Sequence, residues 1–248
     1  MTNEKAPPKG AAVVIGVGAE TGLGAALARR FAREGLRVTI AGRTPERLRV
    51  VAEQITAAGG PVSVKVADAA NEADVAALFD EADRDGAVEL IAYNVGSNVA
   101  ASALETTPEL FERLWRQNAL GGFMVGREAA RRMAPRGKGT ILFTGATASM
   151  RARPPFLAFG AAKAGLRAVA QGLAREFSPQ GVHVAHVVID GVIQGDYAAI
   201  NFADYVRSKG ADGLLAVDDI ADVYWTLHGQ PRSAWTHELD LRPFKEPF

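Results

Sequence analysis

Short apolar runs alternate with longer amphipathic stretches along almost the whole chain, and this alternation is the strongest constraint on the fold. Most of the apolar runs lack in/out alternation, which is typical of strands buried on both faces. We expect strands at 11–17, 37–41, 62–66, 88–93, 139–144, 182–189 and 236–241. The amphipathic stretches predict helices at 22–34, 45–58, 72–84, 108–134, 156–177 and 218–227. Such repeated β-α units predict an α/β fold: a doubly wound, seven-stranded, mainly parallel sheet with helices on both faces.

The sequence contains no internal repeat or linker, so we expect a single domain over residues 11–248. Its 248 residues, of which 48% are hydrophobic, are enough for one large core. Segment 1–10 is polar, lacks the apolar stretch of a signal peptide, and is expected to be a flexible N-terminal arm. The connection 190–217 is long and weakly periodic, a pattern typical of substrate loops and lids.

The charge balance and the cysteine count exclude several classes of function. Lys plus Arg and Asp plus Glu both total 28, so the formal net charge is zero, which gives no reason to expect nucleic acid as a partner. Cysteine is absent, so the chain has no disulfide framework and no thiolate metal site. No apolar run approaches the roughly 18–20 residues that span a bilayer. We therefore expect a cytoplasmic protein that binds neither nucleic acid nor a membrane.

A glycine-rich turn, GVGAETGLG, follows the first predicted strand directly. Its glycines fit the spacing G-x-x-x-G-x-G at Gly18, Gly22 and Gly24. Glycine is needed where the backbone turns with positive φ and where a phosphate must approach the chain closely. The helix that follows would present its free amides and the positive end of its dipole to a pyrophosphate. This turn, placed within a β-α-β pattern, predicts dinucleotide binding.

The end of the second predicted strand bears on the choice of cofactor. An acidic residue there would bind the adenosine ribose 2′-hydroxyl of NAD, whereas this chain has Gly42 followed by Arg43. A guanidinium suits a 2′-phosphate, so we expect NADP, with NAD as the alternative. Glu20 in the glycine-rich turn would oppose that phosphate, and Arg43 is alternatively a solvated loop charge.

These features resemble the short-chain dehydrogenase/reductase family, from about residue 11 to the end of the last strand. VGAETGLG stands for the family's T-G-x-x-x-G-x-G, with Val17 at the threonine, and YNVG resembles its N-N-A-G. Asp190 replaces the proline of the family's P-G turn, and THELDLRPF departs from its V-D-G-G ending. The resemblance implies a Rossmann-type fold. It also implies cofactor contacts from Gly18, Thr21, Gly22, Leu23, Gly24, Arg43, Asp68, Asn94, Gly96, Lys163, Gly191 and Ile193.

The resemblance also assigns Asn118 and Lys163 to the family's catalytic tetrad, but Phe159 stands at the tyrosine and Ala146 at the serine. In the family the tyrosine protonates the carbonyl oxygen, the serine polarises the carbonyl, and the lysine lowers the tyrosine's pKa and binds the nicotinamide ribose. Without the two hydroxyls, general acid catalysis worth roughly 10²–10⁴-fold needs another source. We expect Lys163 to be kept for the ribose. Asn118 is either catalytic or only a backbone bridge that holds open a bulge, and Phe159 is alternatively a plain core residue.

Several other side chains are candidates for the missing proton donor. Those near the predicted cleft are Tyr93, Ser97, Thr147, Ser149 and Asp190, and those in the predicted lid are Tyr197 and Tyr205. Tyr93 is alternatively a core residue, and Asp190 is either a base or a cap. Ser97, Thr147 and Ser149 would act by orienting a water.

The remaining polar and aromatic clusters have structural interpretations. The histidines show no metal-ligand spacing, so we expect no metal; they are His183, His186, His228 and His237. An arginine run on one helix is expected to be a solvated face; it comprises Arg127, Arg131, Arg132 and Arg136. Aromatic residues near the C-terminus are expected in the core or at a subunit interface; they are Trp225, Trp235 and Phe244.

The sequence leaves two functions open. The first is an NAD(P)(H)-dependent oxidoreductase that transfers hydride to or from a small apolar carbonyl or conjugated enone, with a non-standard proton donor. The second is a catalytically silent NADP(H)-binding sensor or partner subunit. By resemblance we also expect a homodimer or homotetramer, paired through the helices at 108–134 and 156–177 and through the last strand.

Overall fold

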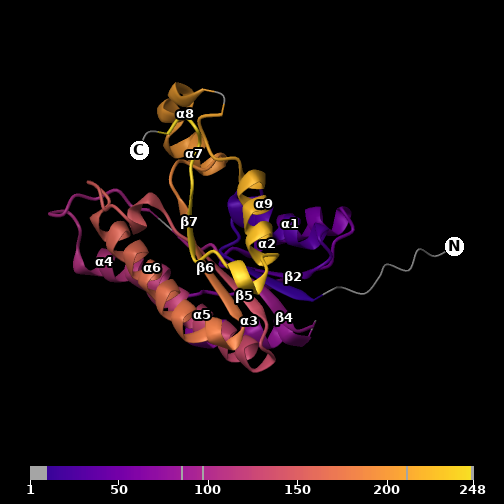
Figure 1. Ribbon diagram of the computed structural model, residues 1–248. Helices are drawn as coiled ribbons and strands as arrows, with labels where there is room; N and C mark the ends of the chain where they lie inside the picture. Colours follow the sequence, from indigo (N-terminus) through magenta and orange to yellow (C-terminus); the bar gives the residue numbers. More distant parts are fainter. Residues whose placement is uncertain (1–9, 85, 97, 211, 247–248) are drawn as a thin grey trace.

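All seven strands of the computed structural model lie parallel in one sheet, in the order β3-β2-β1-β4-β5-β6-β7 (Figure 1). The structure describes residues 10–84, 86–96, 98–210 and 212–246. The strands are β1 (Ala11–Ile15), β2 (Arg37–Gly42), β3 (Val62–Val66), β4 (Val88–Tyr93), β5 (Gly139–Thr144), β6 (Val182–Ile189) and β7 (Glu238–Leu241). The sheet confirms the predicted doubly wound, Rossmann-type architecture, because the chain runs outward from β1 in both directions.

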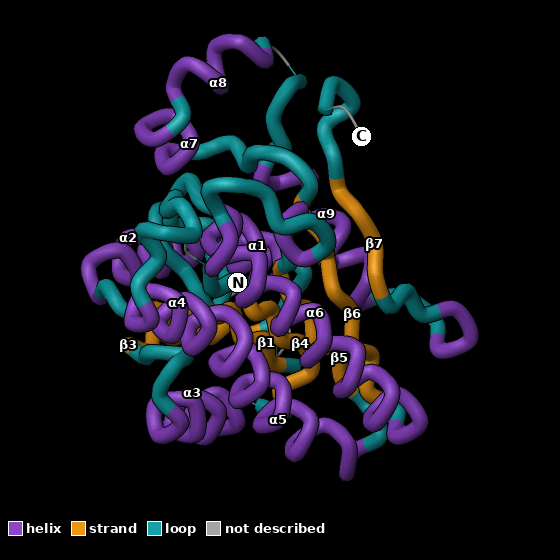
Figure 2. The backbone as a smooth tube through the Cα atoms, turned by 90° about the vertical axis from the view of Figure 1, so that its left-hand side faces the viewer, coloured by secondary structure: helices purple, strands orange, loops and turns teal. Residues whose placement is uncertain are grey.

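Helices cover both faces of the sheet, as predicted (Figures 1 and 2). One face carries α1 (Leu23–Arg33), α2 (Pro45–Ala57) and α9 (Val217–His228). The other carries α3 (Glu72–Arg84), α5 (Gly121–Met133) and α6 (Leu157–Phe177), with α4 (Pro108–Trp115) packed against α6. Two short helices, α7 (Asp196–Asn201) and α8 (Ala203–Lys209), lie beyond the ends of the central strands, near the C-terminal segment.

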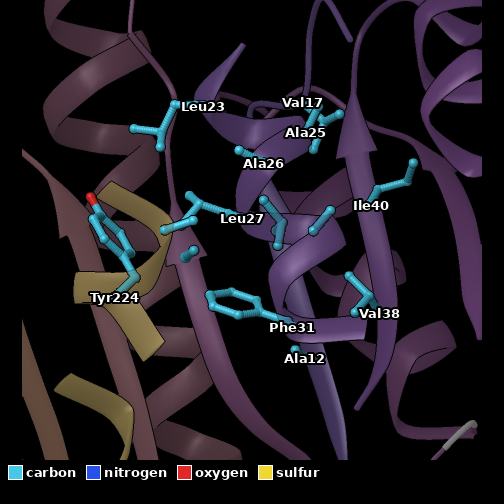
Figure 3. Close-up of a cluster of buried hydrophobic side chains, with 14 of the residues drawn as sticks. Ala12, Val17, Leu23, Ala25, Ala26, Leu27, Phe31, Val38, Ile40 and Tyr224 are labelled. Carbon is cyan, nitrogen blue, oxygen red and sulfur yellow. The ribbon is translucent and has the colours of Figure 1, made fainter. Parts of the chain in front are cut away.

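Two apolar cores hold these layers together, one on each face of the sheet. All five residues of β1 are buried, and they alternate between the two cores. On the face drawn in Figure 3, Leu27 and Phe31 of α1 lie between the sheet and Tyr224 of α9. Burial of a side chain such as Phe31 contributes about 1.5–3 kcal/mol. The central strands are therefore rigid, and the loops at their carboxyl ends are held in fixed positions.

The structure corrects the predicted boundaries in three places. β1 ends at Ile15 and not at residue 17, because Gly16 has φ = 92° and turns the chain out of the sheet. The predicted helix 108–134 is two α-helices joined by a π-helical turn, Arg116–Leu120. The predicted loop 190–217 contains α7 and α8. The predicted N-terminal arm lies, apart from Gly10, outside the described residues.

The described residues contain no helix that is both long and apolar enough to cross a bilayer.

Candidate cofactor and catalytic site

The glycine-rich turn and the end of β4 lie side by side at the carboxyl edge of the sheet. Ile15 pairs with Tyr93 in the β1–β4 ladder, and the Asn94 N–H donates to the Ile15 carbonyl at 2.8 Å. Asn94 Nδ2 also donates to the Gly16 carbonyl at 3.4 Å. A Cβ on Gly16 would lie 2.6 Å from the Asn94 backbone, so this position requires glycine. Gly16 was missed as a site residue because a G-x-G-x-x-G motif that starts at Gly16 would need a glycine where the chain has Thr21.

The start of α1 has the features of a phosphate site. A Cβ on Gly18 would have no described atom within 4 Å, so the space beside this residue is open. Gly22 is the N-cap of α1, and no described side chain caps the helix. Gly24 packs against the first turn, since its Cβ would lie 2.8 Å from the Gly16 carbonyl oxygen. The side chain of Leu23 is buried in the core, so this residue can offer a phosphate only its N–H. The free amides at the positive end of α1 suit a pyrophosphate.

A cavity of about 240 Å³ continues from this turn toward β2. Arg43, in the loop before α2, and Arg47, in its first turn, both line it, and Arg47 was not predicted. Gly42 is required by packing, since its Cβ would lie 2.4 Å from the Val17 carbonyl oxygen. Gln54 of α2 donates to the Glu20 carboxylate. The residues present therefore fit a nucleotide that bears a 2′-phosphate.

Two polar side chains from other strand ends complete the walls of this cavity. Asp68 lines it, and its Oδ1 accepts a hydrogen bond from the Ala70 N–H at 2.9 Å. Asn94 lines it between the glycine-rich turn and Gly96. The structure thus brings Gly18, Arg43, Asp68, Asn94 and Gly96 to one cavity, as the resemblance implied.

Lys163 and Asn118 face the same small space over Gly96. Lys163 Nζ donates to the carbonyls of Val95, at 3.2 Å, and Thr144, at 2.9 Å. Asn118 Nδ2 donates to the Leu114 carbonyl at 2.9 Å, while its buried Oδ1 has no partner among the described residues. A Cβ on Gly96 would lie 3.2 Å from Lys163 Nζ and 3.6 Å from Asn118 Oδ1.

This arrangement leaves a buried acceptor and a spare ammonium proton beside each other. An ammonium has three protons, and two of those on Lys163 are directed at backbone carbonyls. Burial lowers the pKa of Lys163 to about 8, because the charged form is poorly solvated. The unpartnered amide oxygen of Asn118 is costly unless a water or a ligand hydroxyl occupies the space. A sugar hydroxyl fits both groups.

Phe159 and Ala146 lie next to this pair and provide no acidic proton. The Phe159 ring centroid is 5.9 Å from Lys163 Nζ, one turn away on α6. Ala146 follows β5, and its N–H donates to Ser149 Oγ at 3.1 Å. The Phe159 ring therefore forms an apolar wall beside a buried ammonium group.

The hydroxyl protons of two other candidate donors, Tyr93 and Thr147, are already engaged. Tyr93 is fully buried, and its hydroxyl donates to the Gln117 carbonyl at 2.5 Å; burial raises its pKa above the ordinary value. Thr147 Oγ1 donates to Asp190 Oδ1 at 2.6 Å, and Ser149 accepts the bond from the Ala146 N–H. Ser97 lies outside the described residues.

The α7–α8 segment contacts the site from two sides. The Asp196 N–H, at the start of α7, donates to Thr21 Oγ1 at 3.3 Å. The hydroxyl of Tyr197 donates to Asn98 Oδ1, in the loop after β4, at 2.6 Å. Tyr205 of α8 donates to Glu246 Oε2 at 3.0 Å, near the C-terminal end. Thr21 therefore contacts the start of α7, a contact that the glycine motif did not predict.

The two remaining predicted cofactor residues lie at the base of this segment. A Cβ on Gly191 would lie 2.8 Å from Pro243 Cδ, so close packing explains this glycine. Ile193 forms a bridge to Leu215 and packs against the α1 core.

The histidines, arginines and C-terminal aromatic residues lie elsewhere. No described group of three His, Asp or Glu side chains could hold a metal ion. Arg132 is only 16% exposed and pairs with Asp80, Asp83 and Glu128, so the prediction of a purely solvated arginine face was wrong. Packing within the described fold involves Trp225 against Phe31 and Trp235 against His183. Phe244 is 79% exposed.

Comparisons with known proteins agree with this geometry. The profile of the short chain dehydrogenase family matches residues 12–209. The cyclic-di-GMP-binding biofilm dispersal mediator protein of Escherichia coli (strain K12) is 34% identical over 223 residues, covering 88% of this chain and 84% of that protein. A short-chain dehydrogenase structure from Rhodopseudomonas palustris is 39% identical with a TM-score of 0.82, covering 96% of this chain and 100% of that one.

A metagenomic short-chain oxidoreductase, solved in complex with NADP, is 26% identical with a TM-score of 0.80. That match covers 96% of this chain and 98% of the other. The parallel sheet, the glycine-rich turn and the family profile lead to one conclusion: the chain belongs to the short-chain dehydrogenase family.

Proposed function

We propose that this protein is an NADP(H)-dependent oxidoreductase that acts on an apolar carbonyl or conjugated enone, with the Lys163 ammonium group as the proton source. The main observation in support is that Lys163 Nζ and the unpartnered Asn118 Oδ1 face the same space over Gly96, with the Phe159 ring beside Lys163. In this proposal Phe159 and Ala146 occupy the places of the family's tyrosine and serine. The NADP-bound relative and the arginine-lined cavity support the choice of cofactor.

Each group in the site has one task in this scheme. The amides at the start of α1 hold the pyrophosphate, and Arg43 and Arg47 hold the 2′-phosphate. A bound nicotinamide would supply or accept the hydride. Lys163 and Asn118 hold the ribose and a water between them, and the ammonium releases its spare proton through that water. Phe159 excludes bulk solvent from the substrate side.

The missing phenol favours reduction of a conjugated C=C bond over reduction of a ketone. In an enone the hydride goes to the β-carbon, and the proton goes to the α-carbon afterwards. The enolate formed in this way shares its charge between the oxygen and the α-carbon, so a donor directly on the oxygen is less essential than for the localised alkoxide of ketone reduction. A weak acid delivering its proton through water is adequate for the later step.

The test follows NADPH oxidation with enones, ketones and aldehydes at several pH values. Enone turnover should fall as pH rises through about 8, because the protonated form of Lys163 is then lost. Lys163→Met should reduce turnover by at least roughly 10²-fold, the usual contribution of general acid catalysis. Lys138→Met, which removes an exposed lysine paired with Glu89, is the matched control and should change nothing.

The second candidate function is a silent NADP(H)-binding subunit, and the absent hydroxyls at Phe159 and Ala146 favour it. It predicts tight NADPH binding with no turnover of any carbonyl or enone. The double variant Phe159→Tyr with Ala146→Ser should then create ketone reductase activity in a site that otherwise has none. A flat NADPH titration up to millimolar concentration would contradict both functions.

We also propose that the chain forms a homodimer or homotetramer through α5 and α6. The exposed side of α6 carries small residues four apart, Ala164, Ala168 and Gly172, which would allow close approach of a second copy. Light scattering should give a multiple of the 26.2 kDa chain mass, and Ala168→Arg should reduce it. Ala77→Arg, on the exposed side of α3, is the control.

A further inference from the structure

A buried carboxylate next to Gly191 in the chain contacts two arginines. Asp190 follows β6 directly, and its side chain is 8% exposed. Its Oδ1 accepts from Thr147 Oγ1 at 2.6 Å, and its Oδ2 accepts from Arg151 Nη2 at 3.3 Å and also from Arg242 Nη2. Thr147 comes directly after Ala146, and Asp190 directly before Gly191. Thr147 and Asp190 are therefore each adjacent in sequence to a position that the resemblance assigns to the site, Ala146 after β5 and Gly191 after β6.

The two arginines do not have the same surroundings. A buried carboxylate needs a compensating charge, and Arg242, which is 12% exposed, supplies it. The Arg151 side chain is 42% exposed and adds a second positive charge. Of the two arginines that contact Asp190, Arg151 is the more exposed.

Apolar surface surrounds Arg151 on the same segment. Met150 is 47% exposed and Leu157 is 45% exposed, one on each side of it in the chain. The segment is fixed to the loop after β4, because the Ala101 N–H donates to the Pro155 carbonyl at 2.8 Å. The segment after β5 therefore combines exposed apolar side chains with one guanidinium group that Asp190 orients.

We propose that Arg151, oriented by Asp190, binds a carboxylate on the substrate, so that the substrate class is amphipathic carbonyl or enone acids. This inference rests on the proposed oxidoreductase function. A guanidinium presents a planar fork of N–H donors that matches a carboxylate, and only the Nη2 contact is directed at Asp190.

The experiment compares an enone acid with its neutral ester. The probes are 4-oxo-4-phenylbut-2-enoate and its methyl ester, which share the same apolar enone. The wild-type protein should favour the acid in kcat/KM by about tenfold to hundredfold, the usual effect of a hydrogen bond to a charged group. In Arg151→Met this preference should disappear through loss of activity on the acid, while kcat/KM for the ester stays the same.

A matched control distinguishes a specific contact of Arg151 with the substrate carboxylate from a general electrostatic effect of positive charge on this segment. Arg153 is exposed on the same segment, two residues after Arg151. Arg153→Met should keep the preference for the acid, whereas an equal loss in both variants would mean that only overall charge matters and would overturn the proposal. Arg151→Lys should recover part of the preference, because it restores the charge without the fork.

A binding measurement keeps this inference separate from the proposed function. Calorimetry measures the affinity of the NADP-loaded protein for the saturated acid, 4-oxo-4-phenylbutanoate, in the absence of turnover. Arg151→Met should weaken this binding about tenfold or more and leave NADPH affinity unchanged. Equal affinity for acid and methyl ester, or binding of neither, overturns the inference about the substrate. Loss of NADPH binding in the wild-type protein instead overturns the proposed function.

Discussion

At the scale of single residues, Gly42, Arg43 and Arg47 bear on which nucleotide the proposed site would bind. Gly42 leaves no room for the acidic side chain that would favour NAD, since even a Cβ would lie 2.4 Å from the Val17 carbonyl oxygen. Arg43 and Arg47 place positive charge at the cavity that continues from this point. The proposed preference for a phosphorylated ribose therefore rests on the absence of a side chain at Gly42 and on the charges of Arg43 and Arg47.

The choice of cofactor gives a prediction at the residue scale. Arg43→Glu should weaken NADPH binding by about tenfold to hundredfold, because a charge-assisted hydrogen bond becomes a repulsion. NADH, which lacks the 2′-phosphate, should bind no worse than before. Fluorescence titration with both nucleotides measures this change. Arg49→Glu is the control, because Arg49 is exposed on α2 and pairs with Glu53; a comparable loss there would show a non-specific charge effect.

At the residue scale, the sequence was most informative where a motif required a particular residue type at a fixed spacing. Of the residues identified in this way, Gly18, Asn94 and Gly96 line one cavity. The engagement of Tyr93 and Thr147 could not be predicted, since their partners lie far away in sequence or depend on a rotamer. The contact between Thr21 and α7 was missed for the same reason.

At the scale of elements, the candidate site includes two segments whose secondary structure could not be predicted from the sequence periodicity. The π turn between α4 and α5 interrupts an amphipathic pattern that predicts one continuous helix. The short helices α7 and α8 have too few turns to show a clear period. The π turn carries Asn118 into the site, and α7 reaches across to Thr21 and Asn98. Irregular elements are often found at functional sites, where ordinary periodicity is least informative.

The contact between α7 and the loop after β4 gives a prediction at this scale. Tyr197→Phe removes the hydrogen bond to Asn98 and should favour the open lid. The KM for substrate should rise roughly twofold to tenfold, the range of one neutral hydrogen bond. Hydrogen exchange in 196–209 should become faster. Asn98→Ala removes the same bond, so the double variant should be no worse than either single one; additive losses would show that the two side chains act separately.

At the scale of the whole molecule, the sheet was the part best predicted from sequence. Strands buried on both faces need long apolar runs, and those runs leave a clear pattern. The edge strand β7 was less clear, and its partner β6 carries the buried His186. His186 Nδ1 bonds to Glu238 Oε2 at 2.9 Å, and Arg167 of α6 holds the same carboxylate at 2.6 Å. This network joins the last strand to the sheet and to α6.

The buried histidine gives a prediction about acid stability. Burial lowers the pKa of His186 to about 4 from the ordinary 6.5, so the unfolded chain binds a proton in this range that the folded chain does not. The free energy of unfolding should therefore fall by about 2 kcal/mol from this group as pH drops from 7 to 5. Urea unfolding at both pH values measures it. His186→Gln should reduce this pH dependence, and an unchanged dependence would mean that other groups control it.

The π turn at Arg116–Leu120 also bears on how such a site can arise or be lost. A π turn holds one residue more than the α-helical turn it replaces. Deleting a single amino acid there would let α4 and α5 merge into one regular helix, and because the π turn holds the extra residue, the buried faces of the two helices would stay nearly in phase. Asn118 would then leave its position over Gly96 while the core remained intact. A one-residue deletion in this turn could thus displace Asn118 from the site without substituting Asn118 itself.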